Sequence, residues 1–146
     1  MIPHSSFTEL HKALNSGKTS CVETTQAYLS RISKHKNLNA FVEVFEKEAL
    51  NRAKIIDTKI DKGTAGRLAG MVIGIKDNIC FKNHKVSAAS KMLDGFESMF
   101  TATALQNLID QDAIIIGRLN CDEFAMGSAN ENTKDGPVKN PLDTSK

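Results

Sequence analysis

Two short apolar runs constrain the fold of this chain more than any other feature. Residues 71–75 (MVIGI) and 113–117 (AIIIG) contain no polar side chain, which is the pattern of strands buried on both faces of a sheet. Between them, residues 102–109 carry apolar side chains at helical spacing, after a threonine, Thr101, that can cap the helix. A strand, a helix and a second strand predict a parallel pair joined by a crossover helix.

The part of the chain before these runs has a mainly helical pattern. The tetrapeptides Ser6–Glu9 and Ser20–Glu23 are capping boxes, in which a serine hydroxyl and a glutamate carboxylate bond to each other's backbone. Each predicts a helix, and the second helix ends at the basic residues 34–36. Residues 40–45 are short, aromatic and β-branched, so we expect a strand, and residues 49–62 return to helical spacing.

These patterns predict an α/β fold, in which N-terminal helices precede part of a mixed, mainly parallel sheet flanked by helices. We interpret residues 1–146 as the N-terminal portion of a single domain, with a helical lead-in over 1–63 and the start of the α/β core over 64–146. The last ten residues have the pattern of an unfinished loop, so we expect the domain to be truncated. A sheet without its covering strands would expose apolar surface and aggregate readily.

Composition excludes several classes of function. Nineteen Lys and Arg against seventeen Asp and Glu give a net charge of +2, too small for a surface that grips nucleic acid. The three cysteines form no CxxC pair, which favours reduced thiols over a zinc site or a disulfide framework. The first residues lack the pattern of a secretory signal, and no apolar run reaches membrane-spanning length. We therefore expect a cytoplasmic protein without membrane contact.

Lys76 is the candidate of greatest chemical interest, because it directly follows the first apolar run. Partial desolvation at the end of a buried strand would favour its neutral amine, which can act as a base. The alternative is a lysine that simply extends to water. Its neighbour Asp77 can be an ion-pair partner or a turn former.

Other polar residues carry weaker signals. Asp122 and Glu123 are adjacent and do not face each other on a helix, so a helix-start role is favoured over acid–base work. Met126, Gly127 and Ser128 offer backbone that a ligand can approach. No nucleophile motif surrounds Ser87, Ser90 or Ser128, and the four histidines lack the spacing of metal ligands.

Several segments together resemble the amidase-signature family, in particular the branch that forms the amidase component of tRNA-dependent amidotransferases. The first is a Gly-x-Leu-x-Gly lead-in to a strand that ends in Lys76–Asp77. The resemblance lies in residues 66–78, 88–93, 113–120 and 122–128. The chain departs from the family at Val72, where proline is common, and near Asn83, where glycine is common, which affects loop geometry more than chemistry.

This resemblance implies a serine–cis-serine–lysine triad in which Lys76 is the base, with both serines located beyond position 146. It implies hydrolysis of glutamine and assembly with amidotransferase subunits B and C. The ammonia would pass to the B subunit for the amidation of ATP-activated Glu-tRNA(Gln). Met126, Gly127 and Ser128 would lie near the amide pocket. ATP and Mg would be used by the B subunit, and this chain would hold no cofactor or metal.

Two alternatives remain open. One is a stand-alone amidase that acts on other carboxamides, and the other is a non-catalytic fragment that keeps only a surface for subunit interaction. Under the leading interpretation, one triad member of three leaves this chain inactive alone.

Overall fold

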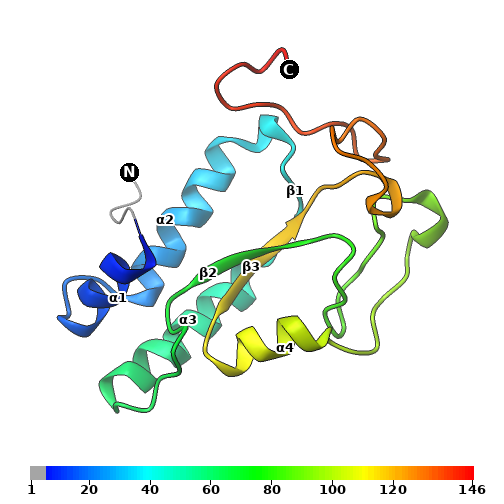
Figure 1. Cartoon of the computed structure of the whole chain (residues 1–146). Coiled ribbons are helices and arrows are strands. Elements are labelled where there is room, and N and C mark those ends of the chain that lie inside the picture. Colours follow the sequence, from blue (N-terminus) through cyan, green and yellow to red (C-terminus); the bar gives the residue numbers. More distant parts are fainter. Residues whose placement is uncertain (1–5) are drawn as a thin grey trace. The chain divides into compact units, whose positions relative to one another are not determined.

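The structure of the protein is a computed structural model, which describes residues 6–146 (Figure 1). Our expectation that no secretory signal begins the chain falls partly on residues 1–5, outside the described part. Every helix and strand predicted from the sequence is present. In chain order the elements are α1 (Phe7–Asn15), α2 (Cys21–Lys34), η1 (Lys36–Leu38), β1 (Phe41–Val44), α3 (Glu46–Asp61), β2 (Val72–Lys76), η2 (Lys91–Leu93), α4 (Thr103–Asp110), β3 (Ile114–Leu119) and η3 (Glu123–Ala125).

The three strands form a mixed sheet in the order β1-β3-β2. β1 pairs with β3 in antiparallel orientation. β2 runs parallel to β3: the Ile114 N–H donates to the Met71 carbonyl at 2.8 Å, and further along both strands the Asp77 N–H donates to the Leu119 carbonyl at 3.0 Å. The predicted α/β class is therefore confirmed. Because β2 and β3 are parallel, the residues that follow them emerge at the same edge of the sheet.

The chain divides into two compact units, and each is built from segments distant in sequence. The first contains residues up to 33, 45–73 and 107–116, and the second contains residues 34–44, 74–106 and 117–146. Our interpretation of the chain as the start of one domain, with a boundary at residue 63, stays a prediction.

In the first unit, helix starts are capped as the sequence predicts. The Ser6 hydroxyl accepts from the Glu9 N–H at 3.3 Å. The second box is reciprocal, since Ser20 accepts from the Glu23 N–H at 3.0 Å and Glu23 accepts from the Ser20 N–H at 3.1 Å. The Asp57 carboxylate of α3 also accepts the first two amides of α2, at 2.7 and 3.1 Å. A carboxylate at this position is favoured by the helix dipole.

Apolar side chains from all three long helical segments form the core of this unit. Gly70 lies against it with a φ of +81°, and a Cβ there would meet the Leu14 side chain at 2.5 Å. Glycine is therefore required by both the backbone conformation and the packing. The buried apolar residues of this unit include Leu10, Ala13, Leu14, Cys21, Leu29, Ala49, Ala53, Ile56, Ala69 and Ile114.

The carboxylate of Asp112 is buried in the first unit, and two cationic side chains balance its negative charge there. It accepts from Arg52 at 2.9 Å, from Lys59 at 2.7 Å and from the Gly66 N–H at 2.9 Å. Burial by itself would raise the pKa of Asp112, but the hydrogen bonds from Lys59 and Gly66 and the two positive charges outweigh burial and hold this pKa below its usual value. Asp112 adopts a φ of +67°, a conformation that aspartate tolerates better than most residues.

The start of α4 differs from the prediction. Thr101 was expected to cap this helix, but its hydroxyl accepts from the Lys82 N–H at 3.2 Å. The first helical carbonyl bond instead runs from the Gln106 N–H to the Ala102 carbonyl at 2.9 Å. The threonine therefore joins the start of α4 to the segment after β2, because a hydroxyl at a helix start can bond to a neighbouring loop as well as to its own helix.

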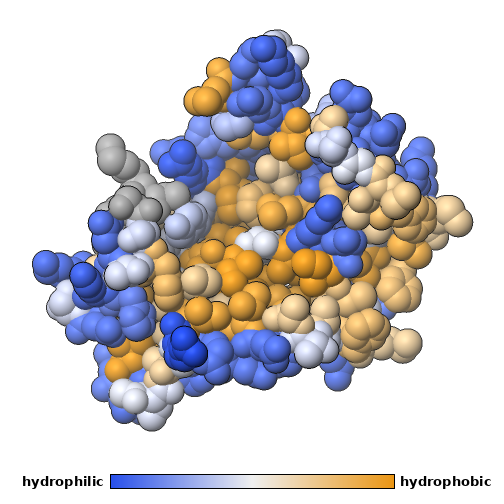
Figure 2. Space-filling view, in the orientation of Figure 1, coloured by the Kyte–Doolittle hydropathy of each residue, from blue (hydrophilic) through white to orange (hydrophobic). Residues whose placement is uncertain are grey.

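Large apolar side chains are exposed in the second unit. Figure 2 shows apolar surface over the segment that follows β2, at the lower right of the view. Met92, Met99 and Met126 are each more than 80% exposed. Exposed apolar surface of this kind commonly marks a place that another protein surface covers. No helix within residues 6–146 has the length and apolar content needed to cross a membrane.

Candidate active site

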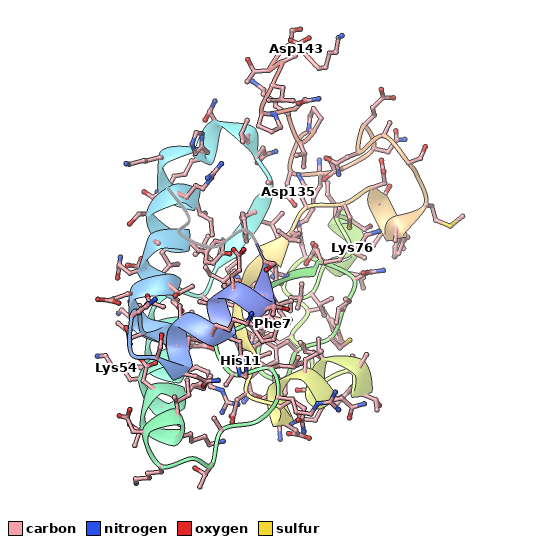
Figure 3. All side chains as sticks on the ribbon, turned by 60° about the vertical axis from the view of Figure 1, so that its left-hand side comes forward. Phe7, His11, Lys54, Lys76, Asp135 and Asp143 are labelled. Atoms are coloured by element: carbon pink, nitrogen blue, oxygen red, sulfur yellow. The ribbon has the colours of Figure 1, made fainter. Side chains whose placement is uncertain are left out.

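Lys76 is the last residue of β2, as predicted, and it emerges at the edge of the sheet where β3 also ends (Figure 3). Gly74 precedes it, and a Cβ at Gly74 would approach the Leu119 side chain of β3 to 3.1 Å, so the two strands lie close together here. Of the two environments considered for Lys76, the described part of the chain shows the second, a lysine that extends to water, because the residue is exposed. Within residues 6–146, its ammonium group has no hydrogen bond or ion pair.

Asp77, next to Lys76, is fully buried, and its side chain is extensively hydrogen-bonded. Its carboxylate accepts from the Ser87 N–H at 3.2 Å, the Ser87 hydroxyl at 2.6 Å and the Ala89 N–H at 3.0 Å. The Arg118 guanidinium donates to it at 2.5 Å. An ionised carboxylate, which only accepts, suits four such donors. Of the two roles considered for Asp77, the ion-pair role is confirmed.

Arg118 is the countercharge of this buried carboxylate. It lies in β3 with only 6% exposure. It also pairs with Glu43 of β1 at 3.0 Å and donates to the Lys85 carbonyl at 2.5 Å. Because a buried charge is stable only when paired and hydrogen-bonded, the side chains of Asp77, Arg118 and Glu43 depend on one another.

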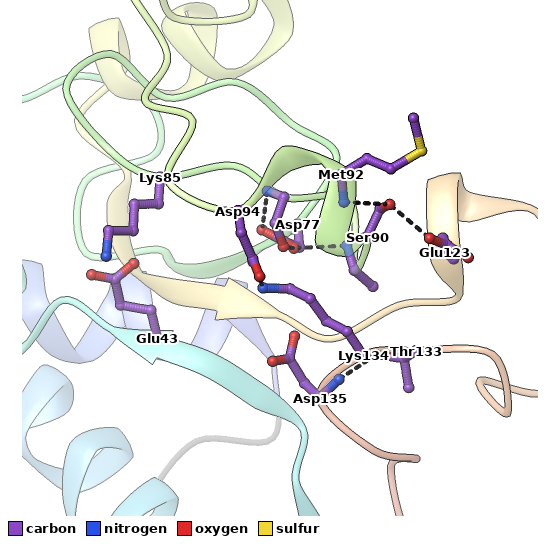
Figure 4. A network of polar contacts seen from close by, with 12 residues as sticks. Glu43, Asp77, Lys85, Ser90, Met92, Asp94, Glu123, Thr133, Lys134 and Asp135 are labelled. Carbon is purple, nitrogen blue, oxygen red and sulfur yellow. Dashed lines mark hydrogen bonds and ion pairs between the residues drawn. The ribbon is translucent and has the colours of Figure 1, made fainter.

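The segment from Ser87 to Ser90 wraps around the Asp77 carboxylate. Ala88 and Ala89 have φ values of +46° and +53°, a left-handed conformation that is unfavourable for alanine. Ser90 is fully buried, and its hydroxyl donates to Glu123 at 2.6 Å (Figure 4). Ser87 and Ser90 thus both donate their hydroxyl protons to carboxylates of this unit.

The candidate substrate residues lie in a loop shaped by Asp122. Its carboxylate accepts the N–H groups of Asn130 at 2.9 Å and Asn132 at 3.1 Å. A Cβ at Gly127 would meet this carboxylate at 2.5 Å, so only glycine fits there. Asp122 is the N-cap residue of η3 and Glu123 lies in its first turn, so both acidic residues stand at a helix start as expected. The Asp122 side chain, however, makes no cap bond to η3 and bonds across the loop instead. The residues 126–128 are exposed.

Backbone bonds connect this loop to the segment around Asp77. The Phe124 N–H donates to the Ala88 carbonyl at 2.8 Å, and the Lys134 N–H donates to the Ala89 carbonyl at 3.2 Å. Ala88 in turn donates its N–H to the Asp77 carbonyl at 2.9 Å. The structure therefore links the neighbour of Lys76 to the loop that carries the candidate substrate residues 126–128. Within the described part of the chain, no hydrogen bond joins Lys76 directly to these three residues.

Sequence reasoning missed the residues that organise this site. The sequence does contain a signal for Arg118, because an arginine within an otherwise apolar strand indicates that a countercharge lies nearby. Ser87 gave none, since a serine in an irregular segment has many possible partners. In the described part of the chain, no group of three or more His, Cys, Asp or Glu residues could hold a metal ion.

The mixed sheet and the helices that accompany it define an α/β protein. A sequence model of the amidase family matches residues 23–146. The chain therefore belongs to the amidase family.

Curated relatives identify the branch that the chain resembles. It is 46% identical over 140 residues to the A subunit of a glutamyl-tRNA(Gln) amidotransferase from Chlorobium phaeobacteroides, a match that covers 95% of this chain and 29% of that protein. It is likewise 46% identical over 136 residues to the same subunit from Salinibacter ruber, covering 92% and 26%. The chain thus spans less than a third of the length of these relatives.

Solved structures agree with the family. The native peptide amidase from Stenotrophomonas maltophilia superposes with a TM-score of 0.87 and 28% identity, over 99% of this chain and 32% of that one. The A subunit of the glutamyl-tRNA(Gln) amidotransferase from Thermotoga maritima superposes with a TM-score of 0.64 and 28% identity, over 82% of this chain and 24% of that one. The chain has a partial α/β amidase fold.

Proposed function

We propose that this chain is the N-terminal portion of the glutamine-hydrolysing component of a tRNA-dependent amidotransferase. The observation that carries the proposal is the 46% identity to the A subunit of a glutamyl-tRNA(Gln) amidotransferase over 95% of the chain. Together with subunits B and C, the complete protein would convert Glu-tRNA(Gln) to Gln-tRNA(Gln) in the cytoplasm. Both compact units would belong to one amidase domain.

Lys76 is the proposed catalytic base. Its ammonium group lies exposed beyond the end of β2 and has no partner in the described chain, so it can face groups that the rest of the protein supplies. A bridging serine would give its proton to the neutral Lys76 amine and take one from the nucleophilic serine, which attacks the carboxamide. Covering Lys76 with the rest of the domain would desolvate the amine and favour its neutral form.

Met126, Gly127 and Ser128 are the proposed substrate-contacting residues. All three are exposed, and the Gly127 position admits no side chain because Asp122 lies behind it. Backbone without a Cβ allows a ligand to approach closely. We propose no cofactor or metal for this chain. ATP and Mg would be used by the B subunit.

The proposal is tested by ammonia release from glutamine. The isolated 146-residue chain should release no more ammonia than buffer, because the proposed triad needs two serines besides Lys76. In the complete protein assembled with its partner subunits, Lys76→Ala should lower kcat by about 10²–10⁴-fold, the contribution of a general base. Lys82→Ala, which removes another exposed lysine of the same unit, should leave kcat unchanged.

Two results would oppose this proposal. Turnover of glutamine by the isolated chain would rule out the triad, and equal activity of the Lys76 and Lys82 variants would rule out Lys76 as the base.

A second candidate, a stand-alone amidase, is favoured by one observation. The TM-score to the peptide amidase is 0.87, against 0.64 to the Thermotoga amidotransferase component. Binding of the complete protein to subunits B and C separates the two candidates: a complex supports the amidotransferase, whereas a monomer that hydrolyses other carboxamides supports the amidase. A fragment that only binds other subunits would bind without either activity.

A further inference from the structure

We infer that Asp77 is a positioning residue, which holds the candidate base Lys76 and the loop 122–134 in one fixed arrangement. It does so by filling an anion-binding turn formed by residues 87–89. The inference rests on the proposed function for its consequence in catalysis, but its structural part can be tested independently. The contacts that carry it all lie within the second unit.

The first set of contacts consists of backbone hydrogen bonds that fix the position of Lys76. Its side chain has no partner within residues 6–146, so its position depends on the backbone that bears it. The Lys76 carbonyl accepts the Ile79 N–H at 2.9 Å, and the Asp77 N–H donates to the Leu119 carbonyl at 3.0 Å. The Asp77 carbonyl also accepts the Ala88 N–H at 2.9 Å. These bonds fix the backbone on the C-terminal side of Lys76, and with it the direction of the Lys76 Cα–Cβ bond.

The turn that receives the carboxylate is shaped for an anion. The N–H groups of Ser87 and Ala89 both point at the Asp77 carboxylate, at 3.2 and 3.0 Å. Neighbouring N–H groups converge in this way in anion-binding nests, which contain left-handed residues. Left-handed backbone is unfavourable at Ala88 and Ala89, so this turn needs compensation. The buried carboxylate supplies it.

The same turn carries the second set of contacts, which act on the loop. The carbonyls of Ala88 and Ala89 accept the N–H groups of Phe124 and Lys134 at 2.8 and 3.2 Å. These carbonyls point toward the loop only while the two alanines keep their left-handed conformation. The Asp77 carboxylate therefore fixes the position of the loop that carries the candidate substrate residues. It does so through the turn at residues 87–89, because it bonds to none of the substrate residues itself.

The chemistry requires a carboxylate at this position. Asp77 faces four donors: two backbone N–H groups, the Ser87 hydroxyl and the Arg118 guanidinium. Asparagine has the same shape, but its NH₂ group would face one or two of these donors and leave them without an acceptor. Asp77→Asn should therefore release the turn without changing side-chain volume.

Amide hydrogen exchange in the 146-residue chain tests the structural part. In Asp77→Asn, the amides of Ala88, Ala89, Phe124 and Lys134 should exchange on the order of ten- to a hundredfold faster, the effect of losing charge-assisted bonds. Ser87→Ala removes only the hydroxyl donor and should accelerate the same four amides by less. It serves as the second variant if Asp77→Asn does not fold.

Asp112→Asn is the matched control. Asp112 is also a buried aspartate with an arginine partner and a backbone N–H donor, but it belongs to the first unit. Asp112→Asn should accelerate exchange of the Gly66 amide. The exchange rates of the four amides named above, relative to the rates of the other amides of the second unit, should stay unchanged. Unchanged exchange of Phe124 and Lys134 in both Asp77→Asn and Ser87→Ala would overturn the inference. The inference would also be overturned if Asp112→Asn accelerated the same four amides as strongly as Asp77→Asn does.

Kinetics of the complete protein with its partner subunits test the consequence for catalysis. Ser87→Ala should lower kcat for glutamine and raise KM together, each by about tenfold, because one carboxylate positions both base and loop. If the unchanged protein does not hydrolyse glutamine, the proposed function fails while the exchange result stands. If it does, and Ser87→Ala alters neither kcat nor KM, the positioning inference alone fails.

Discussion

Replacement of Asp112 by asparagine tests the electrostatic reasoning in the first unit most directly. Asparagine preserves the side-chain shape, tolerates the left-handed φ of +67° and can still accept the Gly66 N–H. What it removes is the negative charge between Arg52 and Lys59. An asparagine that accepts the Gly66 N–H also turns its NH₂ group toward the two cations, so any loss of stability reports on that charge together with the acceptor that both cations lose.

The size of the stability loss depends on how exposed the two cationic partners of Asp112 are. Breaking a buried ion pair by removing one partner costs about 3–5 kcal/mol when the other charge stays buried. Here the side chains of Arg52 and Lys59 are 30% and 38% exposed, so water can solvate both cations after the change. We therefore expect a loss of about 2–3 kcal/mol in the free energy of unfolding. For a chain of this size, that lowers Tm by about 5–10 °C.

The loss should depend on pH in a defined direction. The pKa of Asp112 is lower in the folded than in the unfolded protein. Its contribution is then complete above the unfolded pKa of about 4 and disappears as pH falls through the folded pKa. Urea unfolding followed by far-UV circular dichroism should give a large difference between the two proteins at about pH 7 and a smaller one at about pH 3.

Asp61→Asn provides the control, because Asp61 is an exposed residue at the end of α3. It should change the free energy of unfolding by less than about 0.5 kcal/mol. Our reasoning is refuted if Asp112→Asn is as stable as the parent at neutral pH, or if the difference between them is as large in acid as at neutral pH.

Three further predictions concern other parts of the chain. Ser20→Ala should lower the free energy of unfolding by about 1 kcal/mol in urea titrations, because it removes the cap of α2, whereas Ser20→Thr should lower it less. Burial raises the pKa of Cys21, with the Asp57 carboxylate adding to it, and burial also raises the pKa of Cys121. A thiol reagent at about pH 8 should therefore label Cys80 first, and equal rates in the native protein would contradict this. The exposed apolar side chains of the second unit should bind an apolar dye and increase its fluorescence without denaturant, and no increase would contradict their exposure.

The helices and strands were predictable because their signals are local. The pairing of Ser20 with Glu23 spans three residues, and the run 113–117 contains only apolar side chains, so each element can be recognised from its own segment. The strand-end location of Lys76 followed from the same pattern. Family resemblance then pointed to the same lysine and added the expectation that it is a base in a triad with two serines.

The arrangement around Asp77 was not predictable, since its partners come from elsewhere in the chain. Ser87 is ten residues away and Arg118 forty-one. The choice between a desolvated and an exposed Lys76 stayed open in the sequence, because the end of a strand is desolvated only if another segment covers it. Asp122 lies at a helix start as expected, but the partners of its side chain were not predictable for a related reason: they lie in a loop whose shape the sequence does not reveal.

The separation between Asp77 and Arg118 has a consequence for the nascent chain. During synthesis, the apolar strand 72–75 and the aspartate behind it leave the ribosome well before Arg118, which lies forty-one residues after Asp77. Until then, Lys76 and Asp77 remain hydrated charges directly beside an unpaired strand. Charges that flank an apolar strand act as gatekeepers against association with other chains. The aspartate that is buried in the finished fold thus protects the strand before that fold exists.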